Sequence, residues 1–212
     1  MNILNRMMER QNEVNITAKG SEWSTQGFDW RLAISQEAAE LIDSFDWKWW
    51  KKMKVDVDNA QIEIVDIWHF ILSIMIEEGI EPDDMMASRF DALTKTGEVS
   101  VDEDKDEIIK HFKNINKMAA NDRPAIEIAD ALLMSAGKIG MSLDDITKLY
   151  MGKAVLNEFR QEHGYASGTY IKIWNDLEDN EVMKDIISTI PYNEDFEAEL
   201  ENTLTERYML VE

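Results

Sequence analysis

The chain of 212 residues contains no cysteine. This absence excludes disulfides, thiolate metal sites, iron–sulfur clusters and cysteine nucleophiles, and we expect a reducing cytoplasm as its location. Positive charge is also scarce, with 22 Lys and Arg against 43 Asp and Glu and a net charge of -21. Such a balance disfavours nucleic-acid or anionic-membrane partners. The excess of carboxylates suits divalent cations, although a generally acidic proteome would give the same number.

Long hydrophobic runs are missing as well. The longest apolar stretches, such as residues 71–76, are far shorter than the roughly 20 residues of a membrane span. The N-terminus carries polar residues in place of a signal-peptide core. We therefore expect neither export nor membrane insertion. Hydrophobic residues still make up 44% of the chain, which is enough for a sizeable core.

Only 3 prolines and 9 glycines interrupt the sequence, and apolar residues recur at helical spacing almost throughout. This pattern predicts an all-α fold. Gly79 and Pro82 mark one helix end and the next start, and Ser142 with Asp145 has the spacing of a capping box. The acidic run 101–107 is expected to be a surface connector. Helices are expected over residues 2–16, 28–50, 58–79, 82–95, 103–118, 123–138, 143–163, 168–178 and 193–208.

A weak internal repeat is visible. Residues 62–66 are echoed by 126–130, and 79–84 by 140–145, at offsets of 64 and 61. The repeat predicts a duplicated helical pair, and chance similarity between two acidic amphipathic helices is the alternative.

Two pairs of carboxylates lie three residues apart, Glu37 with Glu40 and Glu63 with Asp66. Residues at this spacing share a helix face, so each pair can point two carboxylates at one place. Apolar residues surround both pairs, and burying four uncompensated negative charges would be prohibitively costly. Two antiparallel helices with these side chains would suit Mg²⁺ or Mn²⁺, which prefer oxygen ligands. The lysines in the segment between the two pairs are the alternative counter-charge, since the spacing itself is common.

The segment 46–52 between the two pairs interleaves three tryptophans with three lysines. Indole faces can stack on a nucleobase, and ammonium groups can contact phosphate. A helix end packed on the core would have the same composition. Further along, Lys153, Asn157, Arg160 and Tyr165 recur at intervals of 4, 3 and 5. This spacing favours a polyphosphate site, or else a solvated basic stripe.

Four motifs in this order and spacing resemble the dimeric, all-α dUTP pyrophosphatases, which belong to the all-α NTP pyrophosphatase superfamily. They are Glu37-x-x-Glu40, the Trp-Lys-Trp-Trp-Lys segment 47–51, the run from Glu63 to Phe70, and the run from Lys153 to Tyr165. The resemblance covers residues 8–178. It implies a catalytic helical bundle over 1–178 and leaves a helical tail, 179–212, without an assigned role.

The resemblance implies a role for each motif. The metal ligands and catalytic residues would be Glu37, Glu40, Glu63 and Asp66, with Glu37 orienting the attacking water and accepting its proton. Substrate contacts would be Gln11 and Asn15 at the uracil edge, Trp49 beside the base, His69 and Phe70 at the deoxyribose, and Lys153, Asn157, Arg160 and Tyr165 at the phosphates. The cofactor would be two or more Mg²⁺ ions, replaceable by Mn²⁺, and the assembly a homodimer.

The second copy of the repeat departs from the pattern. Glu127 and Asp130 match the second carboxylate pair, but positions 101 and 104 are Val and Asp instead of two glutamates. We interpret this copy as degenerate and structural.

The resemblance implies hydrolysis of dUTP, and of dUDP, with water attacking the β-phosphate and dUMP and pyrophosphate leaving. A pyrophosphatase for dCTP and dUTP, or for a broader set of nucleotides, is the nearest alternative, because amide side chains can rotate to read either pyrimidine. An inactive acidic helical protein that only binds a nucleotide or a protein is the alternative from another class.

Overall fold

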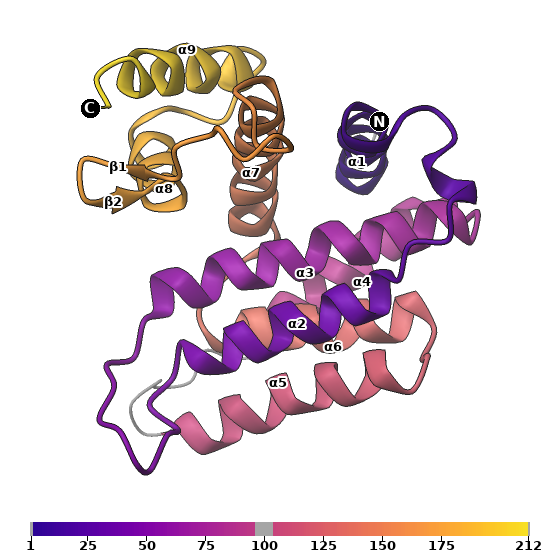
Figure 1. The fold of residues 1–212 in the computed structure, drawn as a ribbon. Helices are drawn as coiled ribbons and strands as arrows, with labels where there is room; N and C mark the ends of the chain where they lie inside the picture. The colour runs from indigo at the N-terminus through magenta and orange to yellow at the C-terminus, as the bar shows by residue number, and fades with distance from the viewer. Residues whose placement is uncertain (1, 96–103, 212) are drawn as a thin grey trace.

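The computed structural model describes residues 2–95 and 104–211, and these are helical apart from turns, loops and one short hairpin. The predicted all-α fold is therefore confirmed (Figure 1). The elements are α1 (Ile3–Lys19), the short 3-10 helix η1 (Trp23–Thr25), α2 (Trp30–Asp43), α3 (Val57–Glu77), α4 (Asp84–Thr94), α5 (Lys105–Ala120), α6 (Ala125–Lys138), α7 (Leu143–Glu162), β1 (Ile173–Trp174), β2 (Leu177–Glu178), α8 (Asp179–Thr189) and α9 (Phe196–Tyr208).

Helices α2, α3, α5 and α6 form one bundle, in which α2 contacts α3 and α5, and α6 contacts α3 and α5. A second group lies across α3: α1 and α7 pack on it, and α8 and α9 pack on α7 (Figure 1). Helix α3 is the centre of both groups. By length and composition α3 could cross a membrane, but 72% of its most apolar window is buried inside the fold, as in the core helix of a soluble protein.

Local signals place several helix ends. The predicted capping box is confirmed, because Ser142 accepts from the backbone N–H of Asp145 while the Asp145 carboxylate accepts from that of Ser142. Gly79 and Gly140 follow α3 and α6 with φ of 65° and 80°, a conformation that favours glycine. The two echoed segments of the repeat thus lie on α3 and α6, which pack together and end in the same way.

The helix expected over 28–50 ends early, at Asp43. Side chains there bond to the local backbone and to each other in place of continuing the helix. Asp46 accepts a 3.1 Å bond from the backbone N–H of Met53, and the backbone N–H of Asp56 donates to the carbonyl of Ser44 over 2.8 Å. Residues 44–56 are therefore a non-helical loop that turns the chain from α2 into α3.

The helix expected over 168–178 is wrong. Asn175 and Asp176 have φ of 49° and 72°, which is the geometry of a tight hairpin turn, and they join β1 to β2. Helix α8 begins directly afterwards and was not predicted from the sequence. Residues 101–103 of the expected surface connector lie outside the described residues, and the rest of it leads into the first turn of α5.

Candidate functional site

The two carboxylate pairs meet where α2 packs against α3. The chain reverses direction between these two helices, which lie side by side (Figure 1). One carboxylate oxygen from each of Glu37, Glu63 and Asp66 lies within 4.8 Å of the other two. Glu40 lines the cavity beside this cluster, and its carboxylate accepts a 2.9 Å hydrogen bond from Gln36.

Crowding and burial change the acidity of this cluster. Burial raises the pKa of Glu37 to about 7, assisted by repulsion from Asp66 and Glu40. Burial also raises the pKa of Glu63 to about 8, assisted by repulsion from Asp66 and Glu37. The charge of Lys153 lowers both pKa values but does not outweigh burial and mutual repulsion, so the cluster lacks full compensating positive charge. A hard divalent cation would supply it, and three converging carboxylate oxygens are the donor set that Mg²⁺ and Mn²⁺ prefer.

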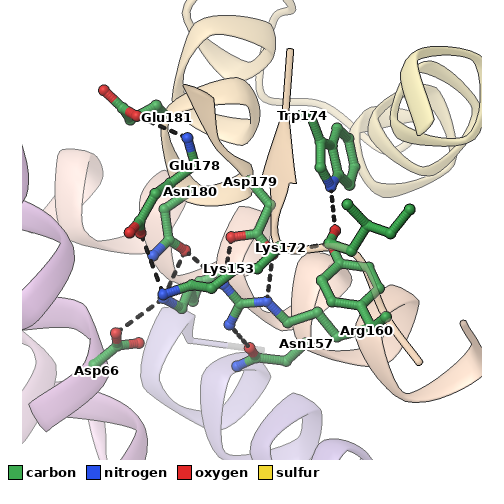
Figure 2. Close-up of polar contacts among 12 residues, drawn as sticks. Asp66, Lys153, Asn157, Arg160, Lys172, Trp174, Glu178, Asp179, Asn180 and Glu181 are labelled. Atoms are coloured by element: carbon green, nitrogen blue, oxygen red, sulfur yellow. Dashed lines mark hydrogen bonds and ion pairs between the residues drawn. The ribbon is translucent and has the colours of Figure 1, made fainter. Parts of the chain in front are cut away.

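Cationic residues of α7 face the cluster from the other side. Lys153, which is 3% exposed, donates a 2.9 Å hydrogen bond to Asp66. Two turns further along α7, Arg160 makes two bonds of 2.8 and 2.7 Å to Asp179 and one of 3.1 Å to Asn157. Figure 2 shows these side chains converging from α3, α7 and the start of α8. Lys153 and Arg160 therefore form a cationic wall, which faces the acidic wall of Glu37, Glu63 and Asp66.

The space between the two walls is a cavity of about 510 Å³. It includes seven residues predicted from the sequence and five that sequence reasoning did not assign. Its lining is Glu37, Glu40, Glu63, Asp66, Lys153, Arg160 and Tyr165, together with Asp43, Asn59, Lys172, Glu178 and Asn180.

One of the unassigned residues could have been found from its spacing. Asn59 lies one turn before Glu63 on α3 and donates a 3.2 Å hydrogen bond to its carboxylate, as expected of i, i+4 neighbours. Lys172 and Glu178 were hidden by the wrong helix prediction over 168–178, and Asn180 was hidden because α8 was not predicted.

Gln11, Asn15 and His69 lie together, but in the protein interior and not in the cavity lining. The side-chain oxygen Oε1 of Gln11 contacts His69 Nδ1 at 2.6 Å and accepts a hydrogen bond from the Tyr150 hydroxyl over 3.1 Å. The Gln11 amide donates to Asn15 over 3.0 Å, and the Asn15 amide donates to Ser73 over 2.9 Å. The three predicted residues therefore form one buried hydrogen-bonded network.

His69 has one nitrogen without a partner in this network. Burial lowers the pKa of His69 to about 3, so the ring is neutral. Because Nδ1 faces the Gln11 carbonyl, Nδ1 carries the proton and Nε2 is left as an acceptor. Nε2 is buried and has no hydrogen-bond partner among the described residues. A buried unpaired acceptor costs about 1–3 kcal/mol, so the atom is suited to receive an N–H or O–H donor from a ligand.

Three predicted residues lie away from the cavity lining. Phe70 stacks on Trp30 with ring centroids 6.0 Å apart. Trp49 is 90% exposed and lines a separate hollow with lysines of its own segment. Asn157 contacts the site through Arg160 only, as far as the described side chains show.

The second repeat copy has a different arrangement. Glu127 forms an ion pair with Arg123, and Asp130 forms one with Arg89. Each of these two carboxylates thus has its own arginine, in contrast to the crowded cluster on α2 and α3.

An all-α bundle with a carboxylate cluster on one side of a cavity and buried cations on the other has the features of a nucleotide-processing protein. The chain belongs to the dUTPase family, whose model matches residues 3–165. The match includes all of the residues predicted above and ends before α8. This membership supports dUTP pyrophosphatase-type activity and a nucleotide substrate in general terms. No curated protein matches the chain.

Proposed function

We propose that the protein hydrolyses dUTP to dUMP and pyrophosphate in a metal-dependent reaction and that it also accepts dUDP. One observation carries the proposal. The three-carboxylate cluster and the buried cation Lys153 meet in a single cavity through the 2.9 Å Lys153–Asp66 contact, inside the part of the chain that matches the dUTPase family.

Glu37, Glu63 and Asp66 would hold Mg²⁺, with Glu40 as a fourth ligand from the same cavity. The raised pKa values of Glu37 and Glu63 support this assignment, because a bound cation would favour their ionised forms. When bound, Mg²⁺ makes a nearby water easier to deprotonate and offsets charge on phosphate oxygens. Mn²⁺ would substitute for it.

The chain's own residues would supply the remaining chemistry. Glu37 would orient the water and accept its proton, because the bound cation would keep its carboxylate ionised at neutral pH. The water oxygen would attack the β-phosphorus, and the bond from that phosphorus to the oxygen it shares with the α-phosphate would break. The products would be dUMP and pyrophosphate. Lys153 and Arg160 would stabilise negative charge on the phosphoryl oxygens.

The proposed uracil site requires the buried network to open toward the nucleotide, because Gln11, Asn15 and His69 lie outside the cavity lining. Gln11 and Asn15 would read the base edge, and His69 Nε2 would accept a hydrogen bond from the bound nucleoside. His69 and Phe70 would border the deoxyribose, while Asn157 and Tyr165 would assist at the phosphates. Trp49 would cover the base; because it is 90% exposed, this requires the loop 44–56 to fold over the bound nucleotide.

We also propose a cytoplasmic homodimer. Residues 1–178 would hold the metal and substrate ligands, and 179–212 would be a helical addition that packs on α7 and contributes Asn180 to the cavity lining. Light scattering should give twice the chain mass of 24.6 kDa. A fully active monomer would refute the dimer and leave the chemistry intact.

The experiment for the proposed function is a comparison of dUTP, dCTP, dTTP and dUDP as substrates in Mg²⁺, with pyrophosphate and phosphate release as readouts. We expect dUTP to have the highest kcat/KM among the triphosphates. Equal values for dCTP and dUTP would move the assignment to a dual pyrimidine enzyme, and turnover of none of them would indicate a binding protein.

A further inference from the structure

The segment that follows the family match reaches the cationic wall of the cavity. Asp179, the first residue of α8, is fully buried and accepts bonds of 2.7 and 2.8 Å from Arg160. The Tyr170 hydroxyl donates a third bond to Asp179 over 2.8 Å. Burial opposes the charged form of Asp179, but the contacts with Arg160 outweigh it and lower the pKa of this carboxyl. Asp179 therefore fixes the guanidinium plane of Arg160.

Asn180, the next residue, contacts both cations with one atom. Its Oδ1 accepts a 2.8 Å bond from Lys153 and a 3.1 Å bond from Arg160 (Figure 2). Asn180 also lines the cavity that contains the carboxylate cluster. Lys153 and Arg160 repel each other, and a neutral oxygen between them keeps both in place without cancelling either charge.

Arg160 and Lys153 each have one N–H donor that the bonds among the described residues do not use. Arg160 has five N–H donors, and four are used by Asp179, Asn180 and Asn157 among the described residues. Lys153 has three, and two are used by Asp66 and Asn180 within the same part of the chain. Each cation therefore keeps one N–H for another acceptor.

Tight packing holds α8 in this position. A Cβ at Gly152 of α7 would lie 3.0 Å from the Met183 sulfur of α8, so glycine allows the two helices to approach closely. Before α8, Trp174 is 2% exposed, and its ring centroid lies 5.8 Å from that of Phe159 on α7. The hairpin and α8 are thus fixed against α7.

We propose that Asp179 and Asn180 are positioning residues of the polyphosphate site: they orient Arg160 and Lys153 so that each presents an N–H to a substrate phosphate. The inference rests on the proposed function, because it assumes that the cavity binds a nucleoside polyphosphate. It gives the start of α8, beyond the family match at residue 165, a part in the reaction.

The test uses the full chain with Asn180→Ala and Asp179→Asn, and with Asp185→Asn as the matched control. Asp185 lies on the same helix but pairs with Arg207 at 2.9 Å, outside the cavity lining. Binding of tripolyphosphate in Mg²⁺ is compared with binding of deoxyuridine, which has no phosphate. Each of the two substitutions should weaken the binding of tripolyphosphate at least tenfold and leave the binding of deoxyuridine unchanged. Misplaced groups can lower rates by about 100-fold, so kcat/KM for dUTP should fall by about 10- to 100-fold. The control should change neither.

Unchanged tripolyphosphate binding in Asn180→Ala would overturn the proposal. An equal loss of affinity for tripolyphosphate and for deoxyuridine would also overturn it, because such a loss indicates a merely structural role. If Asp179→Asn does not fold, the partly exposed Asn180 decides the matter. A wild-type protein that binds tripolyphosphate but does not hydrolyse dUTP would refute the proposed function, while the comparison of variants would still test positioning.

Discussion

Lys153 on α7 donates a 2.9 Å hydrogen bond to Asp66 on α3, and this ion pair joins the acidic and cationic walls of the cavity. Its two side chains are 4% and 20% exposed, so water screens their attraction weakly. The pair brings a predicted metal ligand and a predicted phosphate ligand together from segments 87 residues apart.

Replacing Lys153 by Gln should lower kcat/KM for dUTP by about 100-fold or more, because one preorganised charge facing the phosphoryl oxygens is lost. The matched control is Lys148→Gln on the same helix, since Lys148 donates to the carbonyl of Ile190 outside the cavity lining. Steady-state kinetics of both variants in Mg²⁺ provides the measurement. An equal loss in the control would show that the effect is not specific to the site.

Glu63→Gln should abolish hydrolysis, whereas Glu127→Gln should keep most of it. Glu63 is 7% exposed and belongs to the crowded cluster, so removing its charge weakens the cation site. Glu127 pairs with Arg123 on the outside of α6. The assay is pyrophosphate release at saturating Mg²⁺. Equal inactivation of both variants would contradict the interpretation of the second repeat copy as structural.

Stability of the metal-free protein should fall as pH rises from about 5 to about 8. Glu37 and Glu63 have pKa values raised from 4.5 to about 7 and about 8. The folded state thus binds protons more tightly than the unfolded state, and the stability this gives is lost as pH rises through the folded pKa values.

Mg²⁺ at about 100 times its Kd adds about 2.7 kcal/mol to the free energy of unfolding, which is about 5–10 °C in Tm for a chain of this size.

Thermal unfolding with and without Mg²⁺ at about pH 5.5 and about pH 8 checks this dependence. The increase in Tm should be larger at the higher pH, where the carboxylates no longer hold protons. Glu63→Gln should reduce both the pH dependence and the metal effect. The same increase at both pH values would mean that the cation binds elsewhere.

Asn15→Ala should reduce the preference for dUTP over dCTP and leave Mg²⁺ affinity unchanged. Buried polar groups left unpaired by the wrong base cost about 1–3 kcal/mol each, so the unmodified protein should prefer dUTP by roughly tenfold to several hundredfold. Asn15 is 6% exposed within the Gln11–His69 network. The control is Asn114→Ala on the exposed face of α5, and the readout is the ratio of kcat/KM values. A ratio that Asn15→Ala leaves unchanged would remove Asn15 from base recognition.

The sequence predicted the part of the site that depends on helical periodicity. Glu37 and Glu63 converge because i, i+3 spacing and apolar neighbours determine which helix face is buried. The contacts after Tyr165 depend on positive φ at Asn175 and Asp176. Asn and Asp are the non-glycine residues that adopt this conformation most readily, so the pair was a turn signal that the helix prediction over 168–178 overlooked. Asn180 therefore remained hidden, since its place follows from a hairpin and from tertiary packing.

The most direct test of the central claim is the product analysis of dUTP incubated with the purified protein, in Mg²⁺ and in excess EDTA. Equimolar dUMP and pyrophosphate should form in Mg²⁺, none should form in EDTA, and activity should return when Mg²⁺ is restored. Hydrolysis that survives EDTA, or products consisting of dUDP and phosphate, would contradict a metal-dependent attack at the β-phosphate.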